Sequence, residues 1–172
     1  QDILDDLVTV TDQDVLSHVQ AAVASVNDTT VISTDFSFAL LEATNEIIKT
    51  TEIQETLIKA TADLIDEDFP NYQYVASRLL NMSLRKDLWE KHDKPPALKT
   101  HIEQNITNGI YDSDLLSKFS NEQLKELNDT IDHDRDYLFT YAGLQQLIDK
   151  YLVKNRLTGV IYETPQFAYM CI

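Results

Sequence analysis

Apolar residues recur every three or four positions along most of the chain, a spacing that predicts α-helices. The first helix is expected over about 12–26, and a second begins near residue 34 or 35. Thr51 and Gln54 predict a capping box for a third helix, whose expected buried stripe consists of Ile53, Leu57, Ile58, Leu64 and Ile65. A longer helix is expected over about 71–91, so helices are predicted along the whole first half of the chain.

Pro95 and Pro96 interrupt this helical pattern. A proline pair ends the preceding helix, because the residue before a proline avoids the helical conformation, and it can begin the next one. We therefore predict a domain boundary here, with one domain over 1–92 and another over 93–172. Only three glycines occur in the chain, which disfavours an all-β fold and a glycine-rich phosphate loop.

Short capping signals delimit two helices of the second domain. A helix that begins near Leu98 is expected to end at Gly109, since glycine readily takes the left-handed conformation of a helix C-terminus. Ser120 and Gln123 predict a capping box for the next helix, which is expected to run to Ile131.

The remaining residues predict two more helices and a reversal of the chain. A helix over about 137–152 is followed by two short apolar runs with Gly159 between them, which predicts a short β-hairpin. Thr164 and Pro165 then offer the N-cap and the first position of a last helix. The expected fold class is mainly α with one short β-hairpin.

The last predicted helix, PQFAYMCI, is apolar and has no polar end. Its large side chains would each contribute about 1.5–3 kcal/mol if fully buried, and they are Phe167, Tyr169, Met170 and Ile172. We expect a neighbour outside these residues to cover them, so the chain is interpreted as a piece of a longer polypeptide or as one product of a split gene. The alternative is a terminal helix that docks on its own core.

Charge is unevenly distributed, and it excludes several partners. The net charge is −15, and the first 48 residues carry seven Asp, two Glu and no Lys or Arg, a net charge of −9. Such a surface repels DNA, RNA and anionic lipid, so no nucleic-acid or membrane partner is expected. The cations gather later and are interpreted as a solvated helix end and loop, comprising Arg85, Lys86, Lys91, Lys94 and Lys99.

The compartment is expected to be the cytoplasm. No apolar run approaches the roughly 20 residues that span a bilayer, and the acidic N-terminus lacks the basic region of a signal peptide. One cysteine in the chain rules out an internal disulfide, which fits a reducing compartment.

The acidic run Asp132 to Asp136 is the one segment that suggests a metal site. Alternate positions share a side only on a strand, and in a helix they spread around the axis, which suits metal binding poorly. We therefore expect ion pairing and capping around Arg135, and no metal site.

Five strings resemble the N-terminal region of the large subunit of class I ribonucleotide reductases. They keep their order and spacing over about a hundred residues, and they are NYQYVASRLL from Asn71, LRK from Leu84, PPAL from Pro95, and IDHDRDYLFTYAGLQQLIDKYLVKN from Ile131 followed by TGVIYETPQFAYM from Thr158. The string ETPQFA resembles bacteriophage versions in particular. The resemblance implies a part of the enzyme that reduces ribonucleoside diphosphates to deoxyribonucleotides.

The residues before that region resemble an ATP-cone, the allosteric domain that senses ATP or dATP in this family. The string from Ile47 to Ile65 is similar to the third helix of a cone, and Thr50 and Lys86 match nucleotide-contacting positions. The departure is at residues 1–12, where the family has a basic hairpin and this chain has four aspartates and no cation. Like charges at ~4 Å repel by roughly 1–4 kcal/mol near a protein surface, so the implied cone is expected to be degenerate, with no nucleotide bound.

The resemblance also implies partners. Its chemistry requires more cysteines than Cys171 alone, and that residue is interpreted as a small buried hydrophobe rather than a catalytic thiol. The expected partners are the C-terminal catalytic part of the large subunit and, through the whole enzyme, the radical-generating small subunit. The alternatives are a non-catalytic helical interaction module and a surviving ATP/dATP sensor.

Overall fold

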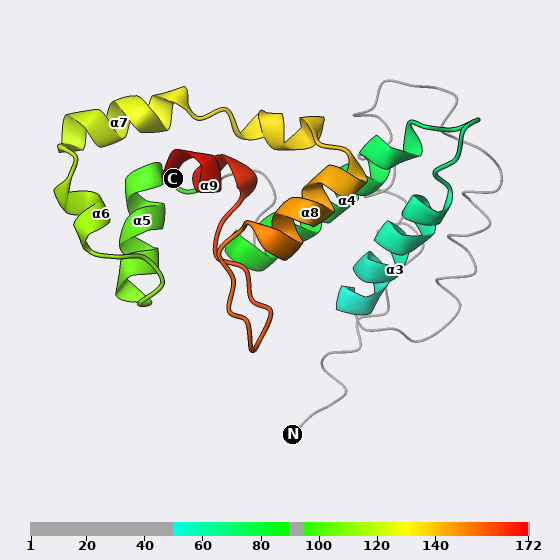
Figure 1. Cartoon of the computed structure of the whole chain (residues 1–172), viewed down its shortest axis with the longest axis horizontal. Coiled ribbons are helices and arrows are strands. Elements are labelled where there is room, and N and C mark those ends of the chain that lie inside the picture. Colours follow the sequence, from blue (N-terminus) through cyan, green and yellow to red (C-terminus); the bar gives the residue numbers. More distant parts are fainter. Residues whose placement is uncertain (1–49, 90–94, 172) are drawn as a thin grey trace. The chain divides into compact units, whose positions relative to one another are not determined.

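The computed structural model describes residues 50–89 and 95–171, with side chains from Gln54 onward, and this part of the chain is mainly helical, as predicted (Figure 1). The expected helices over 12–26 and from residue 34 lie outside the described residues. The chain forms two compact units, unit 1 over Gln1–Ser83 and Phe139–Leu144 and unit 2 over Leu84–Leu138 and Gln145–Ile172. No helix of the described part is long and apolar enough to cross a membrane.

Unit 1 contains α3 (Thr50–Asp63) and the first turns of α4 (Tyr72–Trp89). Thr51 lies inside α3 rather than before it. The core of the unit consists of Leu57, Ile58, Tyr72, Val75 and Leu79, with Leu64, Leu80 and Tyr141 packed against it. Ile65 was predicted to be buried and is instead 36% exposed, because α3 ends at Asp63 and the helical face does not extend to it.

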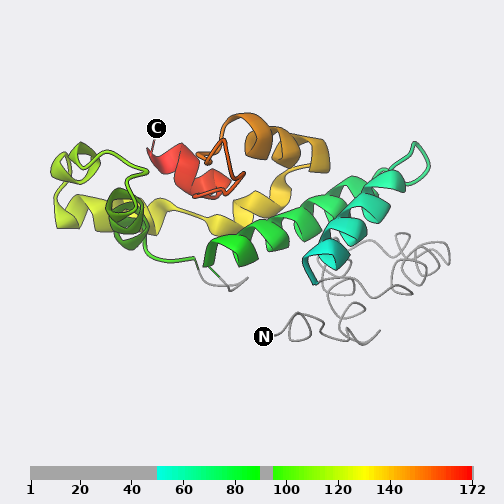
Figure 2. The same ribbon diagram turned by 90° about the horizontal axis from the view of Figure 1, so that it is seen from below.

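Unit 2 contains the last turns of α4 and a series of short helices. These are α5 (Leu98–Thr107), α6 (Asp114–Ser117), α7 (Asn121–Thr130), the 3-10 helix η2 (His133–Leu138), most of α8 (Tyr141–Lys150) and α9 (Pro165–Cys171). Within the unit α5 packs against α6 and α7, and α9 packs against η2 (Figure 2). The main core cluster joins these elements through Leu98, Ile102, Leu124 and Phe167.

Local capping signals act as the sequence predicts. Gly109 follows α5 with φ +70°, and its N–H donates to the Ile106 carbonyl at 2.9 Å. Ser120 and Gln123 form the reciprocal capping box of α7. Both predictions are confirmed, because each depends on residues no more than four positions apart.

The start of the following helix was predicted wrongly. Tyr137 and Leu138 belong to η2, and α8 begins only at Tyr141. The hydroxyl of Thr140 accepts a hydrogen bond from the N–H of Gly143 at 3.2 Å, in the manner of an N-cap. The apolar spacing runs through both elements, so periodicity alone does not show that the cap divides them.

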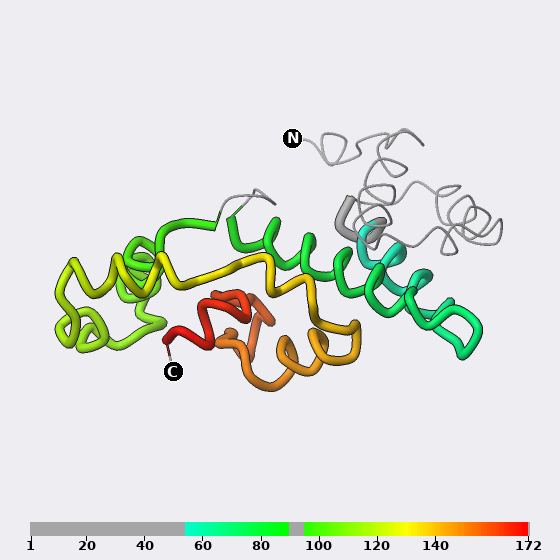
Figure 3. Tube along the Cα trace, turned by 90° about the horizontal axis from the view of Figure 1, so that it is seen from above, coloured from blue at the N-terminus to red at the C-terminus, as the bar shows by residue number. Residues whose placement is uncertain are grey.

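The segment 153–162 reverses direction between α8 and α9 (Figure 3). A single antiparallel bridge joins Lys154 and Ile161, and the described residues contain no longer β-strand. Gly159 sits in the reversal with φ +77°, a conformation that side-chain-bearing residues seldom adopt.

The last helix packs on its own unit. α9 begins at Pro165, as predicted, and Thr164 precedes it without a hydrogen-bond partner for its hydroxyl. Phe167 is fully buried in the core cluster of unit 2, and Met170 is partly buried against it. The expectation that an outside neighbour must cover the apolar side of this helix is therefore wrong for Phe167. Tyr169, on another side of the helix, is 56% exposed.

Candidate functional site

The ring of Phe167 is the centre of a group of aromatic side chains in unit 2. His101 stacks on it, with ring centroids 4.1 Å apart and planes 11° apart. Trp89 and His133 meet it edge to face, at 5.9 Å and 4.8 Å. Each of the two histidines also belongs to a buried polar cluster, so these clusters are the candidate functional site of the described residues.

The first group, the Arg85 cluster, consists of Arg85, His133, Asp136 and Tyr137. The guanidinium of Arg85 donates to the His133 carbonyl at 2.5 Å and to the Tyr137 hydroxyl at 3.1 Å, and it lies 4.7 Å from the centre of the Tyr137 ring. Its side chain is only 3% exposed. Arg85 was predicted to belong to a solvated cationic helix end, and this is wrong because its hydrogen-bond partners lie in η2, inside the unit.

Asp136 provides the opposite charge in this cluster. It is fully buried, and its carboxylate lies 3.6 Å from Arg85 Nη2, an ion pair too long to be a hydrogen bond. Burial raises the pKa of Asp136 to about 6, although Gln166 and Arg85 act in the opposite direction. Arg85 Nε and His133 Nδ1 have no hydrogen-bond partner among the described residues. The cluster therefore holds two buried charges, and the hydrogen bonds of the protein do not fully replace the water that they lost.

The acidic run that contains Asp136 divides into an outer and an inner part. Arg135 pairs with Asp132 at 3.8 Å on the surface, and the N–H of Asp134 donates to the Asp132 carboxylate at 3.1 Å. These contacts confirm the predicted ion pairing and capping. The buried role of Asp136 was not predicted. Within 50–89 and 95–171 no three His, Cys, Asp or Glu side chains converge as metal ligands.

The second group, the Tyr111 cluster, consists of His101, Asn105, Tyr111 and Glu163. Glu163 is 3% exposed, and its carboxylate accepts hydrogen bonds from the Tyr111 hydroxyl and, at 2.8 Å, from the backbone N–H of Val153. His101 Nε2 lies 3.3 Å from the Tyr111 hydroxyl and 3.2 Å from the Asn105 amide nitrogen. Asn105 also donates to the Tyr162 carbonyl at 3.3 Å, so the cluster ties α5 to the segment just before α9.

In and beside the Tyr111 cluster, the pKa shifts keep His101, Tyr111 and Cys171 uncharged at neutral pH. Burial lowers the pKa of His101 to about 4, with a smaller contribution from His133. Burial and then the Glu163 carboxylate raise the pKa of Tyr111 above its ordinary value. The same two causes raise the pKa of Cys171 to about 11. At neutral pH the Cys171 thiol therefore stays protonated, and it is not an activated nucleophile.

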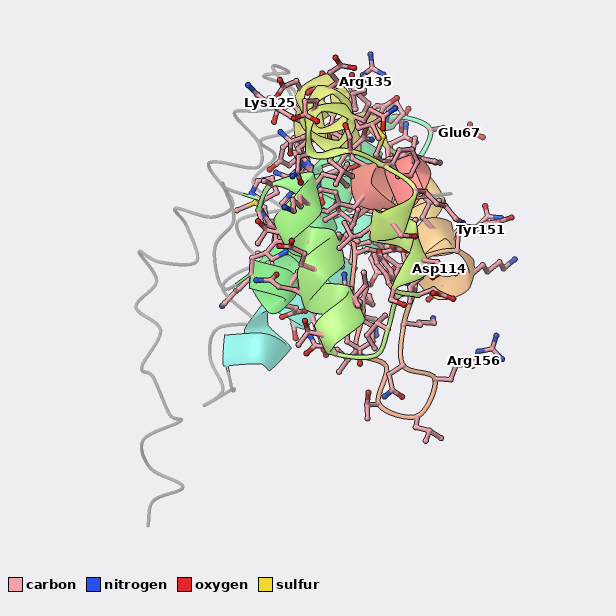
Figure 4. The ribbon with its side chains drawn as sticks, turned by 90° about the vertical axis from the view of Figure 1, so that its left-hand side faces the viewer. Glu67, Asp114, Lys125, Arg135, Tyr151 and Arg156 are labelled. Carbon is pink, nitrogen blue, oxygen red and sulfur yellow. The ribbon has the colours of Figure 1, made fainter. Side chains whose placement is uncertain are left out.

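A pocket of about 430 Å³ opens beside the Tyr111 cluster. Tyr111, Glu163 and Cys171 form part of its wall, and Asp114 of α6 and Tyr151 after α8 also border it. Figure 4 shows the last two side chains near one another on the same side of the molecule. Solvent thus reaches one edge of a cluster that is otherwise buried.

Thr50 and Lys86, the two positions predicted to contact a nucleotide, lie in different units. Thr50 is the first described residue of α3, in unit 1, and Lys86 is an exposed residue in the last turn of α4, in unit 2. Arg85, the neighbour of Lys86, is occupied by Asp136 and η2. In the last described turn of α4, Lys86 is thus the cationic side chain that is exposed to solvent.

Comparison with known proteins gives a consistent set of relatives. The chain is 49% identical over 125 residues to ribonucleoside-diphosphate reductase 1 subunit alpha of Escherichia coli, 73% of this chain and 16% of the relative. It is 48% identical over 123 residues to the alpha subunit of Enterobacteria phage T4, 72% of this chain and 16% of the relative. The alpha subunit of Helicobacter pylori is 37% identical over 126 residues, which are 73% of this chain and 15% of that relative.

These matches cover only a small part of each relative, 15–16% of its length. No family model matches the chain. The identity is nevertheless spread over nearly three quarters of this chain, far beyond a short motif. The chain therefore contains a region of the ribonucleoside-diphosphate reductase alpha subunit, the large subunit of ribonucleotide reductase.

Proposed function

We propose that this chain supplies the N-terminal region of the large subunit of a class I ribonucleotide reductase. In this role it contributes to the reduction of ribonucleoside diphosphates only together with the part that carries the catalytic barrel. The observation that carries the proposal is the 45–49% identity to seven alpha subunits over 123–127 residues.

The partners follow from this role. The chain would associate with the catalytic part of a large subunit, and through the whole enzyme with the radical-generating small subunit, in the cytoplasm. The split of the large subunit between two polypeptides is part of the proposal.

Reconstitution of activity tests the proposal. This chain would be mixed with the remainder of the E. coli alpha subunit, lacking the region that matches, and with the small subunit. We expect CDP reduction to return in proportion to added chain, while the remainder alone stays inactive. Full-length E. coli alpha subunit serves as the positive control. A remainder that binds the chain but never reduces CDP would contradict the proposal.

We also propose that residues 1–92 form an ATP-cone that no longer binds nucleotide. Lys86 is the solvent-facing cation on the described end of α4, and the first 48 residues supply none. A triphosphate would therefore meet far more carboxylates than cations. Calorimetry of the full chain with millimolar dATP tests this, and we expect no heat of binding. A saturable signal that disappears in Lys86→Ala would instead identify a surviving ATP/dATP sensor at Thr50 and Lys86.

A second candidate function is a non-catalytic interaction module derived from this enzyme. Large apolar side chains exposed on unit 2 favour it, notably Leu157 at 97% and Leu138 at 73%. The two functions differ in one measurement, because a module would bind a partner without restoring CDP reduction.

We propose in addition a bacteriophage-type subunit, on the string ETPQFA from Glu163 to Ala168. The phage T4 relative and the E. coli relative are almost equally similar to the chain, at 48% and 49%. A phylogenetic tree of alpha subunits tests this proposal, and we expect the chain to branch among phage sequences.

A further inference from the structure

The reversing loop 153–162 is held in one shape by hydrogen bonds within itself. The N–H of Asn155 donates to the Val160 carbonyl, and the N–H of Gly159 donates to the Asn155 carbonyl, both at 2.8 Å. The Asn155 side chain accepts from the N–H groups of Leu157 and Thr158, at 2.9 and 3.2 Å. Glu163 anchors the base of the loop through the N–H of Val153. The loop is therefore preorganised rather than a loose connection.

This ordered loop presents apolar side chains to solvent. Leu157 is 97% exposed at its tip, Val160 is 51% exposed, and Val153 is 38% exposed near its base. Tyr151, just before the loop, is 66% exposed. Figure 1 shows the loop, in orange between α8 and α9, projecting from unit 2 as a narrow finger. A rigid finger with an apolar tip loses little conformational entropy when another surface covers it.

The charge of the finger is opposite to that of the rest of the chain. Residues 150–162 carry Lys150, Lys154 and Arg156 and no Asp or Glu, although the whole chain has a net charge of −15. Figure 4 shows Arg156 near the tip, directed outward. The finger therefore suits a partner surface that offers an apolar recess with carboxylates at its rim.

We propose that this finger, the loop 153–162 with Leu157 at its tip, is a docking element for the remaining part of a ribonucleotide reductase alpha subunit. The inference rests on the proposed function. In the E. coli relative the matched region is 16% of one polypeptide, so it has a large neighbour within the same subunit. The finger combines a fixed backbone, exposed apolar area and a net positive charge that a surface bearing carboxylates would attract.

Binding of the full chain to the remainder of the E. coli alpha subunit tests the inference. Calorimetry would compare the wild-type chain, Leu157→Asp and the matched control Leu138→Asp, an exposed leucine of η2 in the same unit. We expect Leu157→Asp to weaken binding at least tenfold and Leu138→Asp to change it less than twofold. Arg156→Glu is expected to weaken binding as well and to reduce its dependence on salt. Circular dichroism spectra of the variants should match that of the wild type, since both leucines are exposed.

The outcomes separate this inference from the proposed function. No binding by the wild-type chain would overturn the proposed function and the inference with it. Binding that Leu157→Asp leaves unchanged, or that both leucine variants weaken equally, would overturn the inference alone. Sedimentation of the isolated chain adds a further arm, because a dimer that Leu157→Asp abolishes, with no binding to the remainder, would assign the finger to a second copy and overturn the inference.

Discussion

The Arg85 cluster and the Tyr111 cluster contact the same phenylalanine, yet they satisfy their polar groups in different ways. In the Tyr111 cluster, the Glu163 carboxylate receives one hydroxyl and one backbone N–H, and His101 is kept neutral. In the Arg85 cluster, a guanidinium faces a fully buried carboxylate at 3.6 Å, and Arg85 Nε and His133 Nδ1 lack hydrogen-bond partners among the described residues. The first cluster is a hydrogen-bond network. The second is an ion pair whose mutual attraction is offset by the cost of removing both charges from water.

The difference shows what each cluster depends on. A hydrogen-bonded network loses one contact when one member is removed, whereas a buried ion pair leaves an uncompensated charge. Trp89 is the single tryptophan of the chain and packs on Phe167, so its fluorescence reports the unfolding of unit 2 in each test below.

Removing the buried carboxylate should have the largest effect. We expect Asp136→Ala to lower the free energy of unfolding by about 3–5 kcal/mol, because Arg85 would remain charged and 3% exposed without its partner. Urea denaturation followed by Trp89 fluorescence measures this change. Asp132→Ala is the matched control, since its exposed pair with Arg135 and its hydrogen bond from the Asp134 N–H are together expected to contribute about 1–2 kcal/mol. Equal losses in the two variants would contradict the distinction.

Removing one donor from the Tyr111 cluster should cost less. Tyr111→Phe leaves one oxygen of the buried Glu163 carboxylate without its donor, for which we expect a loss of about 1–3 kcal/mol. Tyr151→Phe is the control, because that tyrosine is 66% exposed. If Tyr111→Phe destabilised unit 2 more than Asp136→Ala, the ranking of the clusters would be reversed.

Protonation acts on the two clusters with opposite sign. The pKa of Asp136 is about 6 in the folded chain, above its ordinary 3.8, so its contribution to stability is full below pH 3.8 and is lost as pH rises to 6. The pKa of His101 is about 4, below its ordinary 6.5, so its contribution is lost as pH falls from 6.5 to 4.

These opposite effects should partly cancel in the wild-type chain. In Asp136→Asn the contribution of His101 remains and that of Asp136 is gone. The stability of this variant should therefore rise with pH, relative to wild type, by about 1 kcal/mol per unit between pH 4 and 6. Urea denaturation at pH 4, 5 and 6 measures the difference, with Asp134→Asn as control. Parallel profiles for wild type and Asp136→Asn would show that Asp136 has an ordinary pKa.

Replacing both charges at once should have the smallest effect. In the double variant Arg85→Met, Asp136→Leu no buried charge remains, so we expect most of the ~3–5 kcal/mol lost in Asp136→Ala to be recovered. The same urea experiment measures it. A double variant as unstable as the single one would mean that the hydrogen bonds from Arg85 to His133 and Tyr137, rather than charge balance, hold η2 in place.

The features that were predicted correctly from the sequence are those that depend on residues close together in the chain. The capping box at Ser120, the glycine after α5 and the proline at the start of α9 each need only a few consecutive positions. The helical class follows from apolar spacing in the same way.

The candidate site was missed because its members are distant in the sequence. Arg85 and His133 are 48 positions apart, and Tyr111 and Glu163 are 52 apart. A lone arginine beside a lysine looks like a solvated charge, and only tertiary packing shows that one is buried and the other exposed. The burial of Phe167 was missed for the same reason, since apolar content predicts that a helix needs cover but not which segment provides it.

The position of Phe167 also determines when unit 2 can fold during synthesis on the ribosome. Its ring completes a core whose other aromatic members, Trp89, His101 and His133, leave the exit tunnel much earlier. Until α9 has emerged, those rings and the polar atoms beside them stay open to water, and they are available to chaperones. Unit 2 is therefore expected to fold only after α9 has emerged, and stalling of synthesis shortly before Phe167 would leave an aggregation-prone intermediate.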